Sequence, residues 1–287
     1  MANPSRTEDF AASPHAETAH GHEPGRPSGE PKSCVVALTA AKDGAGRTTL
    51  AAHLAVAALQ LGLNVGVIDL DCADRALTRW LNRRARINDA NADLVMPASL
   101  QGEPRDPEGE RARWPAAIEA MRRTCALVVV DMPAGGGLLA RDAIARADRV
   151  LTLVPDNDAD VDRLFDVDIK GKDSGRPSSY ARTIWDERLD RARGGRSVLD
   201  WRLMRTRGLG DEGGQSQDRF ADALRRLGAH DAPAMRELAV WRRGFAQGAT
   251  ALDLPASDPE RRAPAEMLRD LLIALRAPGL EGARLAL

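Results

Sequence analysis

Short apolar runs alternate with amphipathic stretches along most of the chain. The runs rich in Val, Leu and Ile predict buried strands at 35–39, 65–68, 126–131 and 150–155. Apolar residues at helical spacing predict helices at 50–61, 76–86, 116–123, 139–147, 219–227 and 260–275. Strands that alternate with helices are typical of βαβ units, so we expect an α/β fold with a mostly parallel sheet.

The remaining segments give weaker patterns. Residues 1–32 are rich in Pro, Ser, Ala, Glu and His, so we expect a disordered N-terminal tail before a single domain at 33–287. The segment from 102 to about 113 is charged and contains Gly and Pro, which predicts a surface loop. Residues 167–196 lose the periodicity and are interpreted as an insertion outside the core, and 199–204 as an edge strand.

A glycine-containing loop follows the first predicted strand. The sequence from 41 to 49 reads AKDGAGRTT and leads directly into the predicted helix. Such a loop aims backbone N–H groups and the positive end of the helix dipole at an anion. Gly46 and Thr48 fit the P-loop pattern G-x-x-x-x-G-K-[ST], whereas Ala41 replaces its first glycine and Arg47 replaces its lysine. The sequence therefore predicts a phosphate-binding loop that is altered at two positions.

Aspartates come at the ends of two predicted strands. Asp69 and Asp71 follow the strand at 65–68, and Asp131 ends the strand at 126–131. The carboxyl ends of parallel strands meet at the edge of the sheet where the loop also opens. Two carboxylates there favour a catalytic or Mg²⁺ role over simple helix capping. Asp131 has the form of a Walker B aspartate, with a helix cap as the alternative.

Composition and charge narrow the class of protein further. The chain has 287 residues, of which 43% are hydrophobic and only 3% aromatic, so Ala, Leu and Val must build the core. A formal net charge of −1 neither favours nor excludes nucleic acid. Cys34, Cys72 and Cys125 have no C-x-x-C spacing, which predicts free thiols in a reducing compartment. No apolar run could span a bilayer and no secretory leader is evident, so we expect a cytoplasmic protein.

With these motifs in view, the chain resembles the ParA/MinD family of deviant Walker ATPases. Lys42 stands at the signature lysine of the pattern K-G-G-x-G-K-[ST]-T. The segment 69–71 resembles the switch I pattern D-x-D, and 131–133 resembles the Walker B and switch II pattern D-x-P. Within the family, the chain is most similar to the MipZ type through 177–180 (PSSY), 185–188 (WDER), 200–201 (DW) and 204–207 (MRTR). The resemblance covers about 34–275.

The resemblance implies a P-loop three-layer sandwich of the SIMIBI type that binds ATP or ADP with Mg²⁺ and forms a homodimer on binding ATP. The nucleotide-binding residues it implies are Lys42, Asp43, Gly44, Ala45, Gly46, Arg47, Thr48, Thr49, Arg205 and Thr206. Thr48 and Asp131 would hold Mg²⁺ with Asp69 near the metal. Asp71 would position the attacking water, and Lys42 would reach the phosphates of the partner subunit.

The resemblance also implies partners. MipZ-type proteins engage a ParB-like protein and an FtsZ-like protein, and their dimers bind DNA nonspecifically, with a location at the nucleoid or the poles. The candidate DNA-binding residues are Arg219, Arg225, Arg226, Arg236, Arg242 and Arg243. A solvated face of mixed charge is the alternative for these arginines, because Asp218 and Asp222 lie close in sequence. The segment 279–287 is short and its single Arg is balanced by a Glu, so we expect no membrane anchor.

Three departures from the family pattern separate two hypotheses. Arg47 is a wide planar donor in place of a compact ammonium, Asp43 adds a negative charge, and Thr206 replaces an asparagine that reads adenine. One hypothesis is an ATP-switched regulator of division-site placement or chromosome partitioning with weak hydrolysis. The alternative is a paralogue with little or no hydrolysis that acts as a protein-interaction scaffold. A metabolic enzyme on the same fold has no matching substrate motif in this chain.

Overall fold

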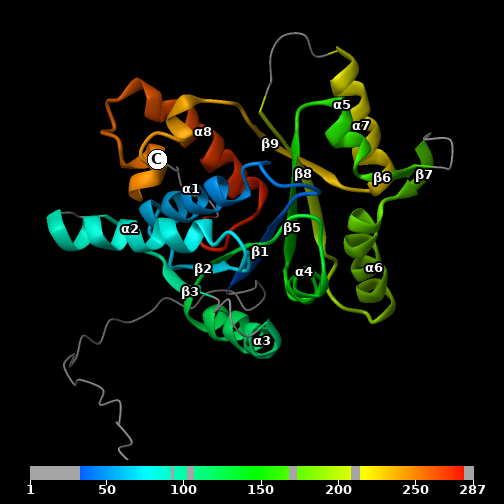
Figure 1. The fold of residues 1–287 in the computed structure, drawn as a ribbon, viewed down its shortest axis with the longest axis horizontal. Coiled ribbons are helices and arrows are strands. Elements are labelled where there is room, and N and C mark those ends of the chain that lie inside the picture. The colour runs from blue at the N-terminus through cyan, green and yellow to red at the C-terminus, as the bar shows by residue number, and fades with distance from the viewer. Residues whose placement is uncertain (1–32, 92–93, 102–106, 168–172, 208–213, 281–287) are drawn as a thin grey trace, which may run out of the picture. The chain divides into compact units, whose positions relative to one another are not determined.

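The computed structural model describes residues 33–91, 94–101, 107–167, 173–207 and 214–280. In these residues a seven-stranded sheet has the order β3-β2-β4-β1-β5-β8-β9, and every neighbouring pair is parallel (Figure 1). Its strands are β1 (Cys34–Thr39), β2 (Val65–Asp69), β3 (Ala98–Gln101), β4 (Leu127–Asp131), β5 (Arg149–Pro155), β8 (Asp200–Thr206) and β9 (His230–Met235). The prediction of a mostly parallel α/β sheet is confirmed. The predicted tail at 1–32 lies outside the described residues.

Helices cover both faces of the sheet. Helices α1 (Arg47–Gln60), α2 (Ala76–Asn91) and α8 (Pro259–Ala274) pack on one face. The other face carries α3 (Pro107–Thr124), α4 (Leu138–Ile144), α5 (Asp158–Asp162), α6 (Ser179–Arg193) and α7 (Gly214–Leu227). In β1, Val36 and Leu38 face the first layer while Val35 and Ala37 face the second. Burial on both faces explains why this strand reads as a continuous apolar run.

The segment 167–196 corrects the expectation that it lies outside the core. It begins with a hairpin of β6 (Phe165–Val167) and β7 (Asp173–Pro177) and continues as helix α6. Tyr180, Ala181 and Ile184 of α6 are buried against the sheet. The Ser178 side chain accepts a hydrogen bond from the Ala181 backbone N–H and so caps the helix. Many arginines and acidic residues dilute the apolar stripe, which is why periodicity alone did not reveal it.

Two further expectations were wrong. The predicted loop at 102–113 is helical from Pro107 onward, because α3 begins there, well before its apolar stripe. The predicted edge strand at 199–204 is β8, which lies between β5 and β9, so the edge is formed by β9 instead. The sequence of β9, HDAPAM, has little strand character, and pairing with β8 rather than propensity holds it in the sheet. None of the helices described is long and apolar enough to cross a membrane.

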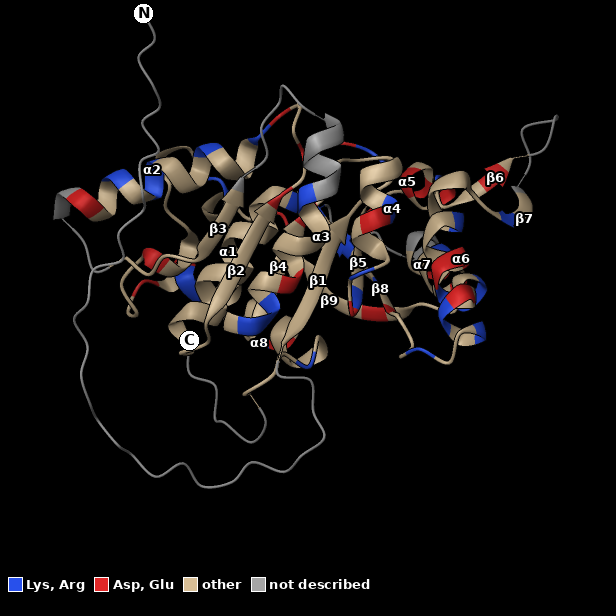
Figure 2. Cartoon of the chain, turned by 90° about the horizontal axis from the view of Figure 1, so that it is seen from below, with Lys and Arg blue, Asp and Glu red and all other residues tan. Residues whose placement is uncertain are grey.

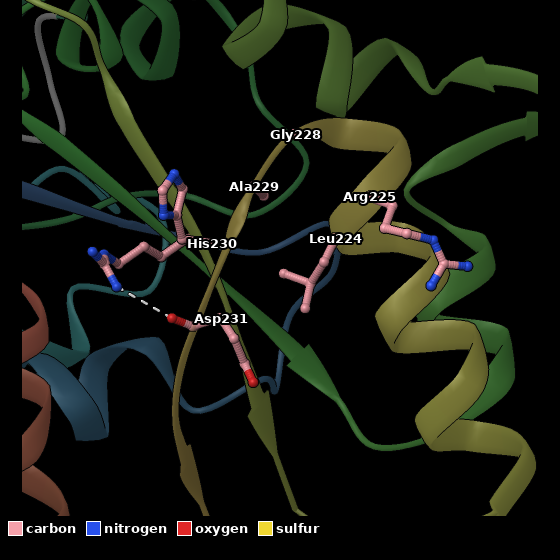
Figure 3. Close-up of a pocket in the computed structure, with 7 residues that line it drawn as sticks. Leu224, Arg225, Gly228, Ala229, His230 and Asp231 are labelled. Atoms are coloured by element: carbon pink, nitrogen blue, oxygen red, sulfur yellow. Dashed lines mark hydrogen bonds between the residues drawn. The ribbon is translucent and has the colours of Figure 1, made fainter.

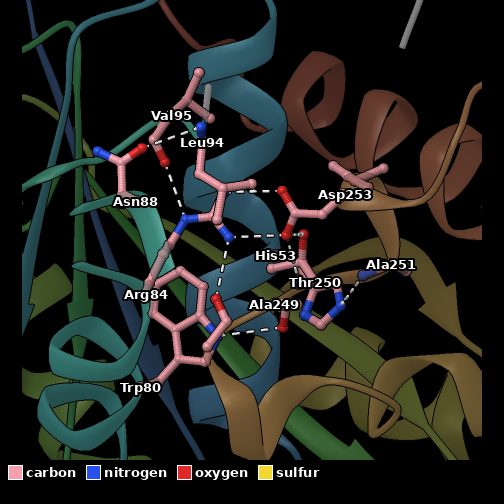
Figure 4. Close-up of polar contacts among 12 residues, drawn as sticks. His53, Trp80, Arg84, Asn88, Leu94, Val95, Ala249, Thr250, Ala251 and Asp253 are labelled. Carbon is pink, nitrogen blue, oxygen red and sulfur yellow. Dashed lines mark hydrogen bonds and ion pairs between the residues drawn. The ribbon is translucent and has the colours of Figure 1, made fainter. Parts of the chain in front are cut away.

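A buried arginine joins α2 to the segment before α8 (Figure 4). Arg84 is fully buried, and its guanidinium donates to both carboxylate oxygens of Asp253 at 2.8 and 2.9 Å. It also donates to the backbone oxygens of Val95 at 3.0 Å and Gly248 at 3.1 Å. The Trp80 ring lies beneath the guanidinium, 5.2 Å from centroid to Cζ. This cluster fixes α2 and the C-terminal segment to one another.

His53 continues the same cluster toward the loop that precedes α1 (Figure 4). Its Nδ1 lies 2.8 Å from the Thr49 carbonyl oxygen, and its Nε2 accepts a hydrogen bond from the Ala251 N–H at 3.0 Å. These partners require a neutral ring with its proton on Nδ1. Burial lowers the pKa of His53 to about 4, which keeps the ring neutral. The first turn of α1 is therefore tied to the segment before α8.

Candidate nucleotide-binding site

The loop between β1 and α1 has the backbone conformation of an anion cradle. Gly44 and Gly46 have φ of 78° and 96°, values that glycine adopts without strain. Gly46 is the N-cap residue of α1, and no side chain caps the helix. The first backbone N–H groups of α1 are therefore available to an anionic ligand, as the sequence pattern predicts.

Arg47 folds back over this loop. Its side chain is only 6% exposed, and Nη2 donates to Asp43 Oδ1 at 2.9 Å. The same Nη2 lies 3.8 Å from Asp71 Oδ2, so the guanidinium stands between two carboxylates. Nη1 is buried and has no hydrogen-bond partner among the described residues. A buried donor without a partner is costly, and here it marks the place where a ligand oxygen would be stabilised.

Thr48 and Asp131 form a second polar pair, at the end of β4. The Thr48 hydroxyl donates to Asp131 Oδ2 at 2.6 Å, while Asp131 Oδ1 is buried and has no partner within the described part of the chain. Burial raises the pKa of Asp131 to about 7, although the Thr48 hydrogen bond and the Arg47 charge both lower it. A hydroxyl beside an unsatisfied carboxylate oxygen fits the oxygen ligands of Mg²⁺. Among the described residues no three His, Cys, Asp or Glu side chains converge, so phosphate and water would complete the shell.

Asp69 and Asp71 take different roles at the end of β2. Asp69 is buried, and its Oδ2 accepts hydrogen bonds from the backbone N–H and the hydroxyl of Thr78, each at 2.8 Å. Burial raises the pKa of Asp69 despite these bonds. Asp69 thus caps the first turn of α2, and its role near a metal stays a prediction. Asp71, by contrast, is partly exposed and faces Arg47.

Lys42 forms an ion pair within the chain, although its side chain is 41% exposed. Its Nζ lies 2.6 Å from Oδ1 of Asp160, a residue of α5 whose side chain is 2% exposed. Burial by itself would raise the pKa of Asp160, but hydrogen bonds from Lys42 and Asn157 outweigh that effect and the pKa lies below its ordinary value. The sequence motif identified Lys42 but not its partner, because nothing in the local pattern marks Asp160.

Comparisons with known proteins show the family and the fold of this chain. The family model "ATPase MipZ" matches residues 34–279, which is most of the chain. The chain belongs to the MipZ family of ATPases. An uncharacterised ATP-binding protein from Methanocaldococcus jannaschii is 28% identical in an alignment of 137 residues that covers 42% of this chain and 52% of that relative. The chain thus aligns with about half the length of this relative.

Two solved structures share the fold of this MipZ-family chain. Apo McdA from Cyanothece superposes with a TM-score of 0.57 at 15% identity, over 84% of this chain and 99% of McdA. The septum site-determining protein MinD from Pyrococcus horikoshii, solved with Mg-ADP, superposes with a TM-score of 0.56 at 16% identity, over 86% of this chain and 99% of MinD. At these identities the likeness establishes the fold alone.

In this MipZ-family chain the residue that follows β8 lies close to the loop between β1 and α1. Thr206 is buried and its hydroxyl has no partner among the described residues, while the Arg205 guanidinium lies 5.3 Å from the centroid of the Phe220 ring. Arg207 has a φ of 65°, and its Nη2 comes within 3.9 Å of where a Cβ on Gly44 would lie. In the sequence Arg207 is only the last residue of the MRTR motif, and nothing in that motif indicates its position beside the loop.

Five of the six candidate DNA-binding arginines of this MipZ-family chain form ion pairs with nearby carboxylates of the described residues. Arg219 pairs with Asp158 and Asp162, Arg225 and Arg226 with Asp222, Arg242 with Glu237, and Arg243 with Glu260. Figure 2 shows a similar interleaving of basic and acidic residues on α6. The arrangement matches the alternative of a solvated face of mixed charge, and DNA binding stays a prediction.

A hollow of about 530 Å³ lies at the opposite end of the sheet (Figure 3). Its lining includes Arg202 near the start of β8, His230 and Asp231 at the start of β9, and Arg225 on α7. Because all strands of the sheet are parallel, the starts of β8 and β9 lie away from the edge where β1 delivers the loop. This hollow is therefore separate from the candidate nucleotide-binding site.

Proposed function

We propose that this chain binds ATP and ADP together with Mg²⁺ at the loop between β1 and α1. The observation that carries the proposal is the pair of unsatisfied buried groups there, the Arg47 Nη1 donor and the Asp131 Oδ1 acceptor. Both accompany the uncapped start of α1. A donor suits a phosphate oxygen and a carboxylate suits a divalent cation, so one Mg-nucleotide would satisfy both groups.

Each residue of the site has a defined part in this proposal. Backbone N–H groups around Gly44 and Gly46 would hold the phosphates, and Thr48 and Asp131 would hold Mg²⁺, which neutralises phosphate charge when bound. Asp71 would position the attacking water. Lys42 would have to leave Asp160 before it could reach the phosphates of a partner subunit.

We further propose that ATP binding drives homodimerisation with weak hydrolysis, and that this switch regulates division-site placement or chromosome partitioning in the cytoplasm. Membership of the MipZ family supports this role. The fold is also that of MinD, which is named as a septum site-determining protein. The proposed partners are a ParB-like protein, an FtsZ-like protein and weak nonspecific DNA. DNA contact driven by phosphates must weaken steeply with salt, and retention that salt leaves unchanged would contradict it.

One observation favours the alternative of a scaffold with little or no hydrolysis. Arg47, which replaces the Walker lysine, is already paired with Asp43. Its planar guanidinium cannot reproduce the contacts of a compact ammonium. In that case the chain would keep the fold and its partner surfaces while nucleotide turnover is lost.

Calorimetric titration with ATP and ADP, with and without Mg²⁺, tests the proposal together with turnover and light-scattering mass measurement. The matched variant is Arg47→Lys, which keeps the charge and restores the family residue. Binding and turnover by the parent chain support the switch. Binding by Arg47→Lys alone identifies Arg47 as the lesion and supports the scaffold, whereas absence of binding by both contradicts the nucleotide site.

A further inference from the structure

Given the nucleotide site proposed above, we propose that the Asp43 carboxylate occupies the place on Arg47 that a nucleotide phosphate would take. Asp43 then competes with the phosphates of a nucleotide for Arg47. In this way Asp43 sets the affinity of the site for the nucleotide. Two residues that depart from the family pattern, Asp43 and Arg47, are thereby assigned to one function.

The geometry of the ion pair shows a ligand-like contact. Arg47 is 6% exposed, whereas the Asp43 side chain is 85% exposed, and Asp43 Oδ1 accepts from Arg47 Nη2 at 2.9 Å. The carboxylate therefore approaches the guanidinium from the solvent side, which is the side from which a nucleotide must enter. Carboxylate and phosphate oxygens are equivalent acceptors for a guanidinium, and both form charge-assisted hydrogen bonds with it. A phosphate that binds Arg47 through both Nη1 and Nη2 would therefore compete with Asp43 for Nη2.

The contact is also one that a ligand can displace. It leaves Arg47 Nη1 buried and without a partner among the described residues. Asp71 Oδ2 remains 3.8 Å from Nη2 and keeps a compensating charge near the guanidinium when Asp43 leaves. An ion pair with a highly exposed carboxylate is weak, because solvent screens it. A phosphate that binds both terminal nitrogens of the guanidinium would displace Asp43. This displacement would weaken the binding of the phosphate only modestly.

Neutralising Asp43 should therefore tighten binding. We expect Asp43→Asn to bind Mg-ATP and inorganic pyrophosphate about three- to tenfold more tightly than the parent chain in calorimetric titration. Asp74→Asn is the matched control, because it removes an exposed carboxylate that lies in a different loop and pairs with Arg79 instead of Arg47. Asp74→Asn removes only general electrostatic repulsion of the nucleotide, so it should change the affinity by less than about twofold.

A double-mutant cycle separates competition from repulsion. In an Arg47→Gln background, Asp43→Asn should gain no more than the Asp74→Asn control does, because there is no guanidinium left to compete for. Thermal melts establish that each variant is folded. Asp43→Gly is a second variant that also removes the carboxylate, and it restores the glycine of the family pattern. Equal gains from Asp43→Asn with and without Arg47 would overturn the competition, as would unchanged or weaker binding by Asp43→Asn when the parent binds. Failure of the parent, Asp43→Asn and Arg47→Lys to bind either probe would instead contradict the nucleotide site itself, and this proposal with it.

Discussion

The buried Arg84–Asp253 pair provides a direct test of how much the contacts between α2 and the segment before α8 contribute to stability. Asp253→Ala removes two hydrogen bonds to Arg84 and leaves a fully buried guanidinium with only the Val95 and Gly248 carbonyl oxygens. It also removes the acceptor of the Thr250 N–H and hydroxyl, at 2.6 and 2.9 Å. Both effects act on the same small cluster, so the loss of stability should be large.

The magnitude follows from the burial of the charge. Breaking a buried ion pair by removing one partner costs about 3–5 kcal/mol, because the other charge is left uncompensated. With a urea slope of about 2 kcal/mol per molar, a loss of about 4 kcal/mol lowers the unfolding midpoint by about 2 M. The assay is urea unfolding followed by circular dichroism. Asp270→Ala is the control, since Asp270 makes only an exposed pair with Arg269 and should cost under about 0.5 kcal/mol.

The double variant Arg84→Met with Asp253→Ala completes the test. Replacing both charges removes the uncompensated ion, so its loss of stability should be clearly smaller than the sum of the two single losses. If Asp253→Ala costs less than about 1 kcal/mol, or if the single losses add fully, the pair is not the buried, coupled interaction that its geometry indicates.

Three further outcomes are expected. Thr48→Ala should reduce Mg-ATP affinity at least tenfold but leave metal-free binding nearly unchanged, and equal losses with and without Mg²⁺ in calorimetry would contradict the metal role. Asp160→Asn should free Lys42 and so lower severalfold the protein concentration at which ATP-dependent dimers form. Light scattering measures the dimer fraction, and an unchanged fraction would contradict this expectation. The pKa of His53, about 4 when folded, lies below its ordinary 6.5, so the unfolded chain takes up the proton first as pH falls. The free energy of unfolding should drop by about 3 kcal/mol between pH 6.5 and 4, and His53→Gln should remove that part of the slope.

The sequence predicted those elements whose burial is written into local composition. The strands β1, β4 and β5 are apolar on both faces and were found, whereas β9 contains a proline and few apolar residues and was missed. Helix α6 was missed because its buried Tyr180, Ala181 and Ile184 stand among charged residues. Propensity cannot reveal elements that owe their place to tertiary pairing.

The candidate site divides in the same way. The loop, Thr48 and the strand-end aspartates follow motifs with fixed spacing, and these could be predicted. The contact of Lys42 with Asp160 and the approach of Arg207 to Gly44 join segments far apart in sequence, so no local pattern contains them. The pairing of Asp43 with Arg47 is local, but the sequence does not show that the guanidinium is buried or that its Nη1 has no hydrogen-bond partner among the described residues.

The two edges of the sheet bear on how copies of the chain can assemble. One edge is β3, which has four residues, and the other is β9, where Pro233 has no N–H to offer a neighbouring strand. Short strands and proline at an edge discourage the addition of strands from another molecule. Growth of the sheet into a filament or a shared sheet is therefore disfavoured. Copies of this chain must therefore associate through surfaces formed by side chains and loops. A bound ligand can change the shape of such a surface, whereas it cannot change a ladder of backbone hydrogen bonds.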